Sequence, residues 1–279
     1  MQVAATIEEM RALRRAMVGD VGLVPTMGFL HEGHLSLVRA ARERDDHVVV
    51  SCFVNPTQFG PDEDFERYPR DEERDLALLR EERVDAVFSP AVEEMYPPGA
   101  ATFVEVEGIT DVLEGAHRPG HFRGVTTIVS KLLHIVQPNR AYFGRKDAQQ
   151  LLVVRKMVQD LRLDVEIVDM PTVREPDGLA MSSRNAYLSP EERQAALALS
   201  RALACAEELF AAGERDGDRL RSAMSAQIGQ EPAARIDYVS VADTETLREL
   251  ARIDVAALAS LAVRIGPVRL IDNVTLEPA

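Results

Sequence analysis

The sequence predicts an α/β protein in which a doubly wound parallel sheet is followed by a smaller α+β domain. Residues 21–24 form an apolar run that breaks at a turn containing Pro25 and Gly28 and continues as an amphipathic helix. Residues 47–54 form an almost unbroken β-branched and apolar run, which is typical of a parallel strand covered on both faces. A doubly wound sheet of this kind binds ligands at the carboxyl ends of its strands.

The other elements follow from periodicity and from stop signals. Helices are expected at 6–17, 71–82, 125–136 and from 144 onward, and strands at 84–88, 102–106, 141–143 and 164–168. The helix over 125–136 has its apolar residues at i, i+3, i+4, i+7, i+8 and i+11, so one face should lie in the core. Residues 61–70 form a long polar loop, either a lid over the crevice or a solvated connection.

The pattern changes after residue 171. A capping-box sequence at Ser189 to Glu192, with proline at the first helical position, predicts a helix to about residue 212. A second helix is expected over 218–228, and strands over 236–241, 257–265 and 268–271. We therefore expect two domains, residues 1–172 and residues 173–279.

Composition limits the class of protein. The chain has 279 residues, of which 46% are apolar and 28% charged. This composition is typical of a globular protein, and the length is sufficient for two domains. A net charge of −14 argues against a general nucleic-acid binder, although an acidic protein can still bind ATP if it gathers cations locally. The first twenty residues lack the apolar core of a signal peptide, and no apolar run is long enough for a membrane span, so we expect a cytoplasmic protein without a membrane partner.

The two cysteines, Cys52 and Cys205, have no pair-like spacing. Cys52 falls within the second apolar run. A buried free thiol is therefore expected there in preference to a disulfide or a nucleophile.

Two histidines mark the first turn. His31 and His34 lie where the predicted turn becomes a helix, and residues three apart on a first helical turn point the same way. Gly33 leaves no side chain between them, so a phosphate could approach the backbone, and the helix start favours an anion. Imidazole groups beside such a site can donate to phosphate oxygens.

Two simpler interpretations of the histidines stay open. They could be surface polar residues on an ordinary βα turn. They could also join a metal site, because His117 and His121 are four residues apart; the spacing is not His-Glu-x-x-His, and no cysteine cluster accompanies it.

Four further segments carry polar groups at predicted element ends: residues 55–58, 114–123, 144–150 and 181–184. Lys146 next to a helix start suits phosphate, and Asp147 could hold a metal or cap its helix. Ser182, Ser183 and Arg184 could wrap a triphosphate, or form an ordinary loop. Gln58 and Gln150 can donate and accept at once, which suits a hydroxy acid.

Taken together and in order, these motifs resemble the pantoate–β-alanine ligase (pantothenate synthetase) family of the His-x-Gly-His nucleotidylyltransferase superfamily. The resemblance rests on residues 25–28, 31–34, 53–59, 118–124, 144–147, 181–185 and 269–273. It implies a Rossmann-like fold and a homodimer. It also implies ATP as co-substrate with Mg²⁺, whose direct protein ligands the sequence does not identify. Pantoate would be activated as an adenylate with release of pyrophosphate, and β-alanine would then displace AMP.

The resemblance also implies roles for individual residues. His34 matches the catalytic histidine, with His31, Lys146 and Arg184 as further cationic or donor groups. Gln58 matches a residue shared by pantoate and β-alanine, and Gln150 a pantoate ligand. The implied ATP contacts are Met27, Gly28, Phe29, Leu30, His31, Glu32, Gly33, His34, Gly144, Arg145, Lys146, Asp147, Val173, Met181, Ser182, Ser183 and Arg184. The chain departs from the family pattern at three positions, where smaller, apolar or non-basic residues are expected: Phe29, Thr57 and Arg145.

Two other functions stay open. One is a nucleotidylyltransferase that acts on a phosphorylated acceptor; Gln58 and Gln150 count against it. The other is a nucleotide sensor without catalysis; His34 and Lys146 count against that.

Overall fold

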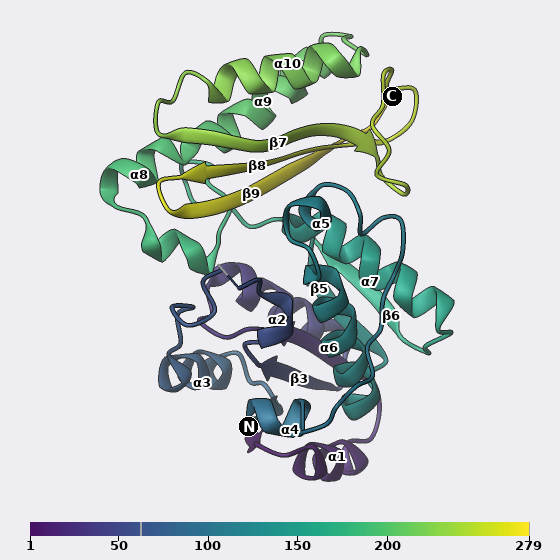
Figure 1. The fold of residues 1–279 in the computed structure, drawn as a ribbon. Coiled ribbons are helices and arrows are strands. Elements are labelled where there is room, and N and C mark those ends of the chain that lie inside the picture. Colours follow the sequence, from purple (N-terminus) through teal and green to yellow (C-terminus); the bar gives the residue numbers. More distant parts are fainter. Residues whose placement is uncertain (62, 279) are drawn as a thin grey trace. The chain divides into compact units, whose positions relative to one another are not determined.

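A computed structural model describes residues 1–61 and 63–278 (Figure 1). The chain divides into two compact units. The N-terminal unit comprises residues 1–145 and 149–171, and the C-terminal unit comprises residues 146–148 and 172–279. The loop predicted at 61–70 includes Asp62, which lies outside the described residues; the described residues of that stretch contain no helix or strand.

The N-terminal unit is built on a six-stranded parallel sheet. Its strands are β1 (Gln2–Ala4), β2 (Val21–Thr26), β3 (His47–Cys52), β4 (Ala86–Phe88), β5 (Arg140–Gly144) and β6 (Glu166–Met170), in the order β1-β4-β3-β2-β5-β6. The chain runs outward from β2 through β3 to β4 and then resumes on the other side of β2 at β5. The topological switch point therefore lies at β2 and β5, which confirms the doubly wound fold.

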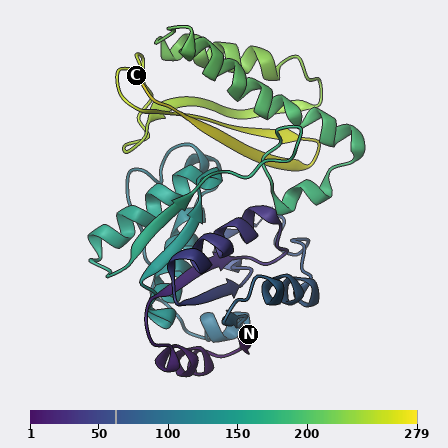
Figure 2. The same ribbon diagram turned by 180° about the vertical axis from the view of Figure 1, so that it is seen from behind.

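Helices cover both faces of this sheet. Leu23, Val49 and Phe143 pack in one cluster with α1 (Ile7–Ala16), α6 (His121–Val136) and α7 (Ala148–Asp160). The neighbouring strand residues Val24 and Val50 pack in a second cluster with α2 (Glu32–Arg44) and α3 (Glu72–Glu81). Successive strand residues point to opposite faces, so the unbroken apolar runs reflect burial on both sides. Figure 1 shows α6 in front of the strands, and Figure 2 shows α2 on the opposite side.

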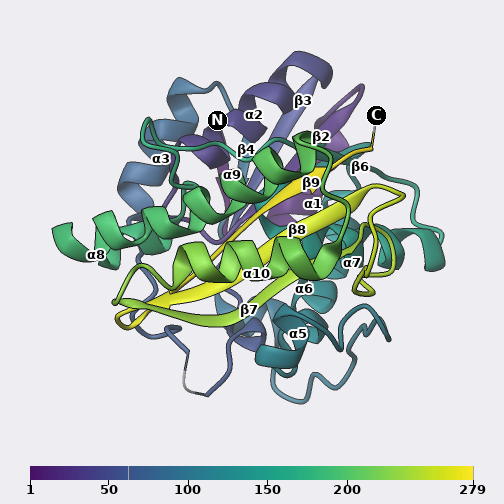
Figure 3. The ribbon, with the colours of Figure 1, turned by 90° about the horizontal axis from the view of Figure 1, so that it is seen from above.

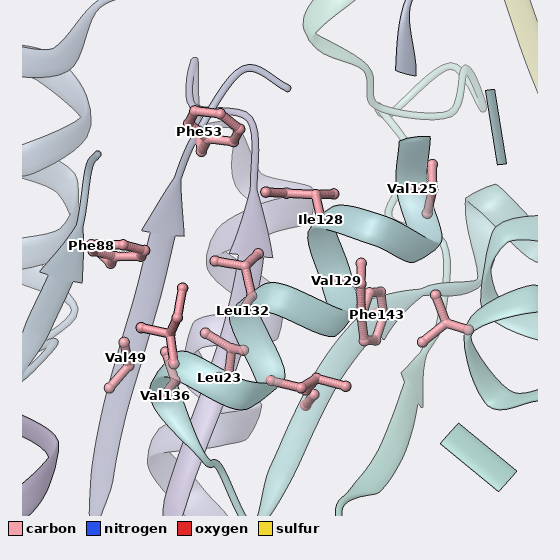
Figure 4. Packing of buried hydrophobic residues seen from close by; sticks show 14 of the residues in the cluster. Leu23, Val49, Phe53, Phe88, Val125, Ile128, Val129, Leu132, Val136 and Phe143 are labelled. Carbon is pink, nitrogen blue, oxygen red and sulfur yellow. The ribbon is translucent and has the colours of Figure 1, made fainter. Parts of the chain in front are cut away.

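The apolar face predicted for α6 is confirmed. Its residues Val125, Ile128, Val129, Leu132 and Val136 are at most 6% exposed. Figure 4 shows them facing Leu23, Val49 and Phe143 of the sheet. Each fully buried aliphatic side chain of this size contributes about 1.5–3 kcal/mol, so this face anchors α6 and the residues at its N-terminus.

Two predicted elements differ from the structure. The sequence predicts a strand over residues 102–106, but in the described chain they belong to no strand. The backbone of Val104 is instead held by threonines of α6: its N–H donates to Thr127 Oγ1 at 3.0 Å, and its carbonyl accepts from Thr126 Oγ1 at 2.6 Å. The helix expected from 189 to 212 is interrupted at Ala196, giving α8 (Pro190–Ala195) and α9 (Leu197–Ala211).

The C-terminal unit pairs helices with an antiparallel sheet. Strands β7 (Ala234–Asp243), β8 (Ala257–Ile265) and β9 (Val268–Leu276) are joined in that order, and α9 and α10 (Gly217–Ile228) lie over them (Figure 3). Leu199, Leu203, Leu220 and Met224 of the helices pack with Leu261 of the sheet, all at most 1% exposed. The predicted capping box is present, with Ser189 Oγ accepting from Glu192 N–H at 3.2 Å.

Candidate active site

The turn after β2 is fixed by hydrogen bonds at its base. Thr26 Oγ1 donates to the Ser51 carbonyl at 2.7 Å and accepts from the Gly28 N–H at 3.2 Å. Gly28 and Phe29 both have positive φ, +77° and +49°. Glycine adopts this conformation without strain, whereas phenylalanine does so only where the surroundings hold it.

Asp75 of α3 provides that hold. Its carboxylate accepts hydrogen bonds from the N–H groups of Phe29 at 2.6 Å and Leu30 at 2.7 Å, and the residue is 3% exposed. Burial raises the pKa of Asp75, and these two hydrogen bonds oppose the shift. Asp75 carries no signal of this role in the sequence, because it lies in a helix so rich in charged residues that its face is expected to be solvated.

His31 and His34 form a capping box at the start of α2. His31 Nδ1 accepts from the Gly33 N–H at 3.1 Å, and His34 Nδ1 accepts from the His31 N–H at 3.3 Å. A nitrogen that accepts a backbone N–H carries no proton, so the neutral rings carry theirs on Nε2, where each can act as a donor. The centroids of the two imidazole rings are 4.0 Å apart, so the rings lie side by side at the start of the helix. The N–H groups of His31 and Gly33 therefore already donate to imidazole nitrogens within the capping box.

Gln58 ends the 3-10 turn η1 (Pro56–Gln58), which follows β3. Its amide Nε2 contacts Met27 Sδ at 2.9 Å, which places Gln58 beside the β2–α2 turn. Its Oε1 accepts from the side chain of Asn55 at 3.2 Å. Asn55 is 1% exposed and also donates to the Gly124 carbonyl at 3.1 Å, so the strand end is tied to α6.

His121 holds the main chain of Gln58. Its Nδ1 lies 2.8 Å from the Gln58 carbonyl oxygen, and its Nε2 lies 3.1 Å from Arg118, whose guanidinium also pairs with Glu63 at 2.7 Å. A carbonyl only accepts and a guanidinium only donates, so the ring has its proton on Nδ1. Burial and the charge of Arg118 lower the pKa of His121 to about 4, so the ring is neutral. Both ring nitrogens are therefore engaged in structural hydrogen bonds, which argues against His121 as a metal ligand.

The two adjacent glutamines of α7 have different environments. Gln149 is buried, accepts from the Glu114 N–H at 2.9 Å and donates to the carbonyls of Ile109 and Val112 at 2.8 and 2.9 Å. Its amide is used in holding the segment before α5 (Glu114–His117). Gln150, the predicted pantoate ligand, is partly buried on the same helix.

Arg145, a predicted ATP contact, has an acidic partner in the structure. It opens the 3-10 turn η2 (Arg145–Asp147) and pairs with Asp169 of β6, which also pairs with Arg155. These two guanidinium groups lower the pKa of Asp169 against the opposing effect of burial. Arg145 thus helps to join β5 to β6.

Lys146, Asp147, Val173 and residues 181–184, which are further predicted ATP contacts, belong to the C-terminal unit, whereas Gly144 ends β5 in the N-terminal unit. Lys146 groups with this unit, and its carbonyl accepts from Asn273 Nδ2 at 2.8 Å. Ser182 caps the 3-10 turn η3 (Ser183–Tyr187) by accepting from the Arg184 N–H at 3.3 Å. Asn185 holds the same turn by donating to Glu175 and to the Ala180 carbonyl, both at 3.1 Å. The segment 181–184 is therefore a structured turn.

A cavity of about 300 Å³ adjoins the β2–α2 turn inside the N-terminal unit. Met27, Gly28 and Phe29 form one wall, and the other lining residues are Cys52, Phe53, Val54, Phe65, Arg70, Asp71, Glu72, Asp75, Leu76, Val87, Ser89, Pro90, Ala91 and Val92. The histidines and Gln58 are not among them. The thiol of Cys52 is free, and burial raises its pKa to about 12, as suits an unreactive core cysteine.

Within residues 1–61 and 63–278, no group of three or more His, Cys, Asp or Glu side chains is arranged to hold a metal ion. A Mg²⁺ ion bound mainly by substrate phosphates and waters needs no such cage. The described helices include none with the length and apolar character needed to cross a membrane.

The fold and the site define a Rossmann-like nucleotide-binding protein with paired histidines at the helix start beside the switch point. The sequence model for pantoate–β-alanine ligase matches residues 2–275. The chain belongs to the pantoate–β-alanine ligase family, as the motifs indicated.

Its relatives match along the whole chain. It is 66% identical to the pantothenate synthetase of Roseiflexus castenholzii and 59% identical to that of Moorella thermoacetica, over 99% of this chain and 100% and 98% of theirs. The crystal structure of pantothenate synthetase from Thermus thermophilus superposes with a TM-score of 0.96 at 52% identity, covering both chains fully. The ligase of Francisella tularensis, complexed with β-γ ATP and β-alanine, gives 0.82 at 33% identity over 100% of this chain and 99% of that chain.

Proposed function

We propose that this protein condenses pantoate with β-alanine at the expense of ATP, through a pantoyl-adenylate intermediate. The observation that carries the proposal is the imidazole capping box of His31 and His34 at the end of a turn whose Met27 contacts the Gln58 amide. It joins two phosphate-directed donors to a group suited to a hydroxy acid, at the switch point of the sheet. Family membership supplies the substrate classes.

In the first step, a carboxylate oxygen of pantoate attacks the α-phosphorus of ATP in line. The new O–P bond replaces the bond to the bridging oxygen, and pyrophosphate leaves with that electron pair. Negative charge grows on the phosphoryl oxygens and on pyrophosphate. The Nε2–H groups of His31 and His34, with Lys146 and Arg184, are proposed to stabilise this charge from fixed positions.

In the second step, the neutral amine of β-alanine attacks the activated carbonyl carbon. The C–N bond forms, AMP leaves with the electrons of the C–O bond, and the nitrogen loses a proton. Gln58 and Gln150 are proposed to orient the pantoyl group, with Gln58 also near the amine substrate. No side chain needs to bond covalently to an intermediate.

Several finer features are part of the same proposal. The other proposed ATP contacts are residues 27–34, 144–147, 173 and 181–184. Mg²⁺ would arrive with ATP and offset phosphate charge when bound. The mixed anhydride hydrolyses in open water, so the domain of residues 173–279 is proposed to close over it. The homodimer and the cytoplasmic location stay predictions.

The test is a product balance. Purified protein with ATP, Mg²⁺, pantoate and β-alanine should give pantothenate, AMP and pyrophosphate in equal amounts. Omitting pantoate should abolish AMP formation. AMP transfer to a phosphorylated acceptor in place of pantoate would indicate another nucleotidylyltransferase, and ATP binding without turnover would indicate a sensor.

A further inference from the structure

We infer that Tyr96 and Thr57 are positioning residues that act through Asn55 to fix which end of the Gln58 amide faces the substrate. The inference rests on the proposed role of Gln58 and deepens it. It assigns Gln58 as a hydrogen-bond donor, so Gln58 recognises substrate oxygen atoms and not the ammonium group of β-alanine.

Two main-chain groups of fixed polarity contribute to the orientation of the Asn55 amide. Its Oδ1 lies 3.4 Å from the N–H of Thr57, and its Nδ2 lies 3.1 Å from the carbonyl of Gly124. If the amide were reversed, its NH₂ group would face the Thr57 N–H, donor against donor, and its oxygen would face the Gly124 carbonyl, acceptor against acceptor. Each unpaired buried polar group costs about 1–3 kcal/mol, so one orientation is strongly favoured.

Two hydroxyl groups reinforce this orientation. Tyr96 Oη donates to Asn55 Oδ1 at 2.8 Å, and Thr57 Oγ1 donates to the same oxygen at 2.9 Å. The Tyr96 ring packs 6.4 Å from Phe53 and lies under the Lys131 ammonium at 4.1 Å. Burial raises the pKa of Tyr96, which keeps its proton available.

The orientation of the Asn55 amide determines that of the Gln58 side-chain amide. Because Asn55 Nδ2 is a donor, the Gln58 atom 3.2 Å away is the oxygen, and the amide nitrogen is at the opposite end, 2.9 Å from Met27 Sδ. The main chain of Gln58 cannot shift freely, because His121 holds its carbonyl at 2.8 Å. An N–H donor beside Met27 pairs with carboxylate or hydroxyl oxygens and cannot accept from an ammonium group.

The experiment compares Tyr96→Phe, Thr57→Val and the double variant, each of which removes hydroxyl groups with little change in shape. Tyr142→Phe is the matched control, since it removes a buried hydroxyl bonded to Asp45 and away from Asn55. Each single variant should raise the KM for pantoate about tenfold, and the double variant more, with the KM for ATP within about twofold of wild type. Tyr142→Phe should leave both values unchanged.

An unchanged pantoate KM in the double variant, or an equal rise for ATP and pantoate, would overturn the inference. A readout without turnover separates it from the proposed function: the ¹⁵N–¹H signals of the Gln58 side chain, assigned by their loss in Gln58→Glu. One sharp pair in the ligand-free wild type and a broadened or doubled pair in the double variant support the inference even if pantoate is not the substrate. Identical sharp pairs in both proteins contradict it.

Discussion

The carboxylate of Asp75 accepts a hydrogen bond from the N–H of Phe29 at 2.6 Å, across 46 residues of sequence. Phe29 has a φ of +49°, a conformation that costs a non-glycine residue of the order of 1–3 kcal/mol unless its surroundings impose it. Asp75 therefore offsets strain in the turn that leads to His31. The position of the histidine pair depends on a residue of a different helix.

Replacing Asp75 with asparagine should weaken this turn. The amide keeps one acceptor oxygen but turns an NH₂ group toward a backbone N–H, which leaves one buried donor unpaired at a cost of about 1–3 kcal/mol. Urea unfolding should show this loss of stability, and pantoate-dependent turnover should fall with it. Glu73→Gln, an exposed change on the same helix, is the control and should alter neither. Equal stability of Asp75→Asn and wild type would contradict this account of the turn.

His34→Ala should greatly reduce activation while the protein stays folded. Removing one preorganised donor costs on the order of 10²–10³ in rate, and the lost cap costs only about 1 kcal/mol of stability. Pantoate-dependent exchange of pyrophosphate into ATP measures the step directly. His134→Ala, at an exposed position on α6, serves as control. Near-normal exchange by His34→Ala would remove His34 from the catalytic groups.

The lowered pKa of His121 predicts that the free energy of unfolding depends on pH. Its pKa falls from an ordinary value of 6.5 to about 4 in the folded protein, so between these values the unfolded chain binds a proton that the folded one does not. Stability from this source is full above pH 6.5 and is lost as pH falls toward 4. Between about pH 7 and about pH 5 the loss is about 2 kcal/mol.

The comparison protein is His121→Asn, whose amide N–H can still donate to the Gln58 carbonyl. Its free energy of unfolding should fall by about 2 kcal/mol less than that of wild type over the same pH interval. If the two proteins lose the same amount, His121 does not carry a lowered pKa.

Gly124→Ala should disturb the Gln58 turn. A Cβ at Gly124 would lie 2.3 Å from the Thr57 carbonyl oxygen and 2.6 Å from the Gln58 nitrogen, so the backbone of η1 would have to move. We expect pantoate KM to rise at least tenfold. Gly60→Ala is the control: Gly60 lies two residues after η1, the nearest heavy atom to a Cβ there is 3.7 Å away, and the variant should behave as wild type. Normal pantoate use by Gly124→Ala would show that η1 tolerates the shift.

The sequence predicted the parts of the fold that depend on local pattern. The unbroken strands, the apolar face of α6 and the turn before His31 follow from periodicity and from proline and glycine positions. The strand predicted at residues 102–106 was wrong, because an alternating pattern does not reveal that Thr126 and Thr127 make the hydrogen bonds that a strand partner would make. The ion pair of Arg145 with Asp169 could not be predicted, because the two residues are distant in sequence.

In the candidate site, too, some residues could be predicted from the sequence and others could not. Residues with a motif of their own, such as His34 and Gln58, could be found from the sequence. Asp75 and Tyr96 could not, because their importance comes from burial and from partners more than thirty residues away. His121 was found from the sequence only as a possible metal ligand, and its bond to the Gln58 carbonyl was not predictable. Only the folded chain shows that their polar atoms are used in holding backbone or amide groups in place.

The central claim, activation of pantoate before the amine takes part, is tested most directly by a single-turnover experiment. Protein, ATP, Mg²⁺ and pantoate are mixed without β-alanine, denatured rapidly and analysed by mass spectrometry. We predict one equivalent of pantoyl adenylate together with pyrophosphate, and a chase with β-alanine should convert it to pantothenate and AMP. Absence of the adenylate, with pyrophosphate release only when β-alanine is present, would contradict the two-step account.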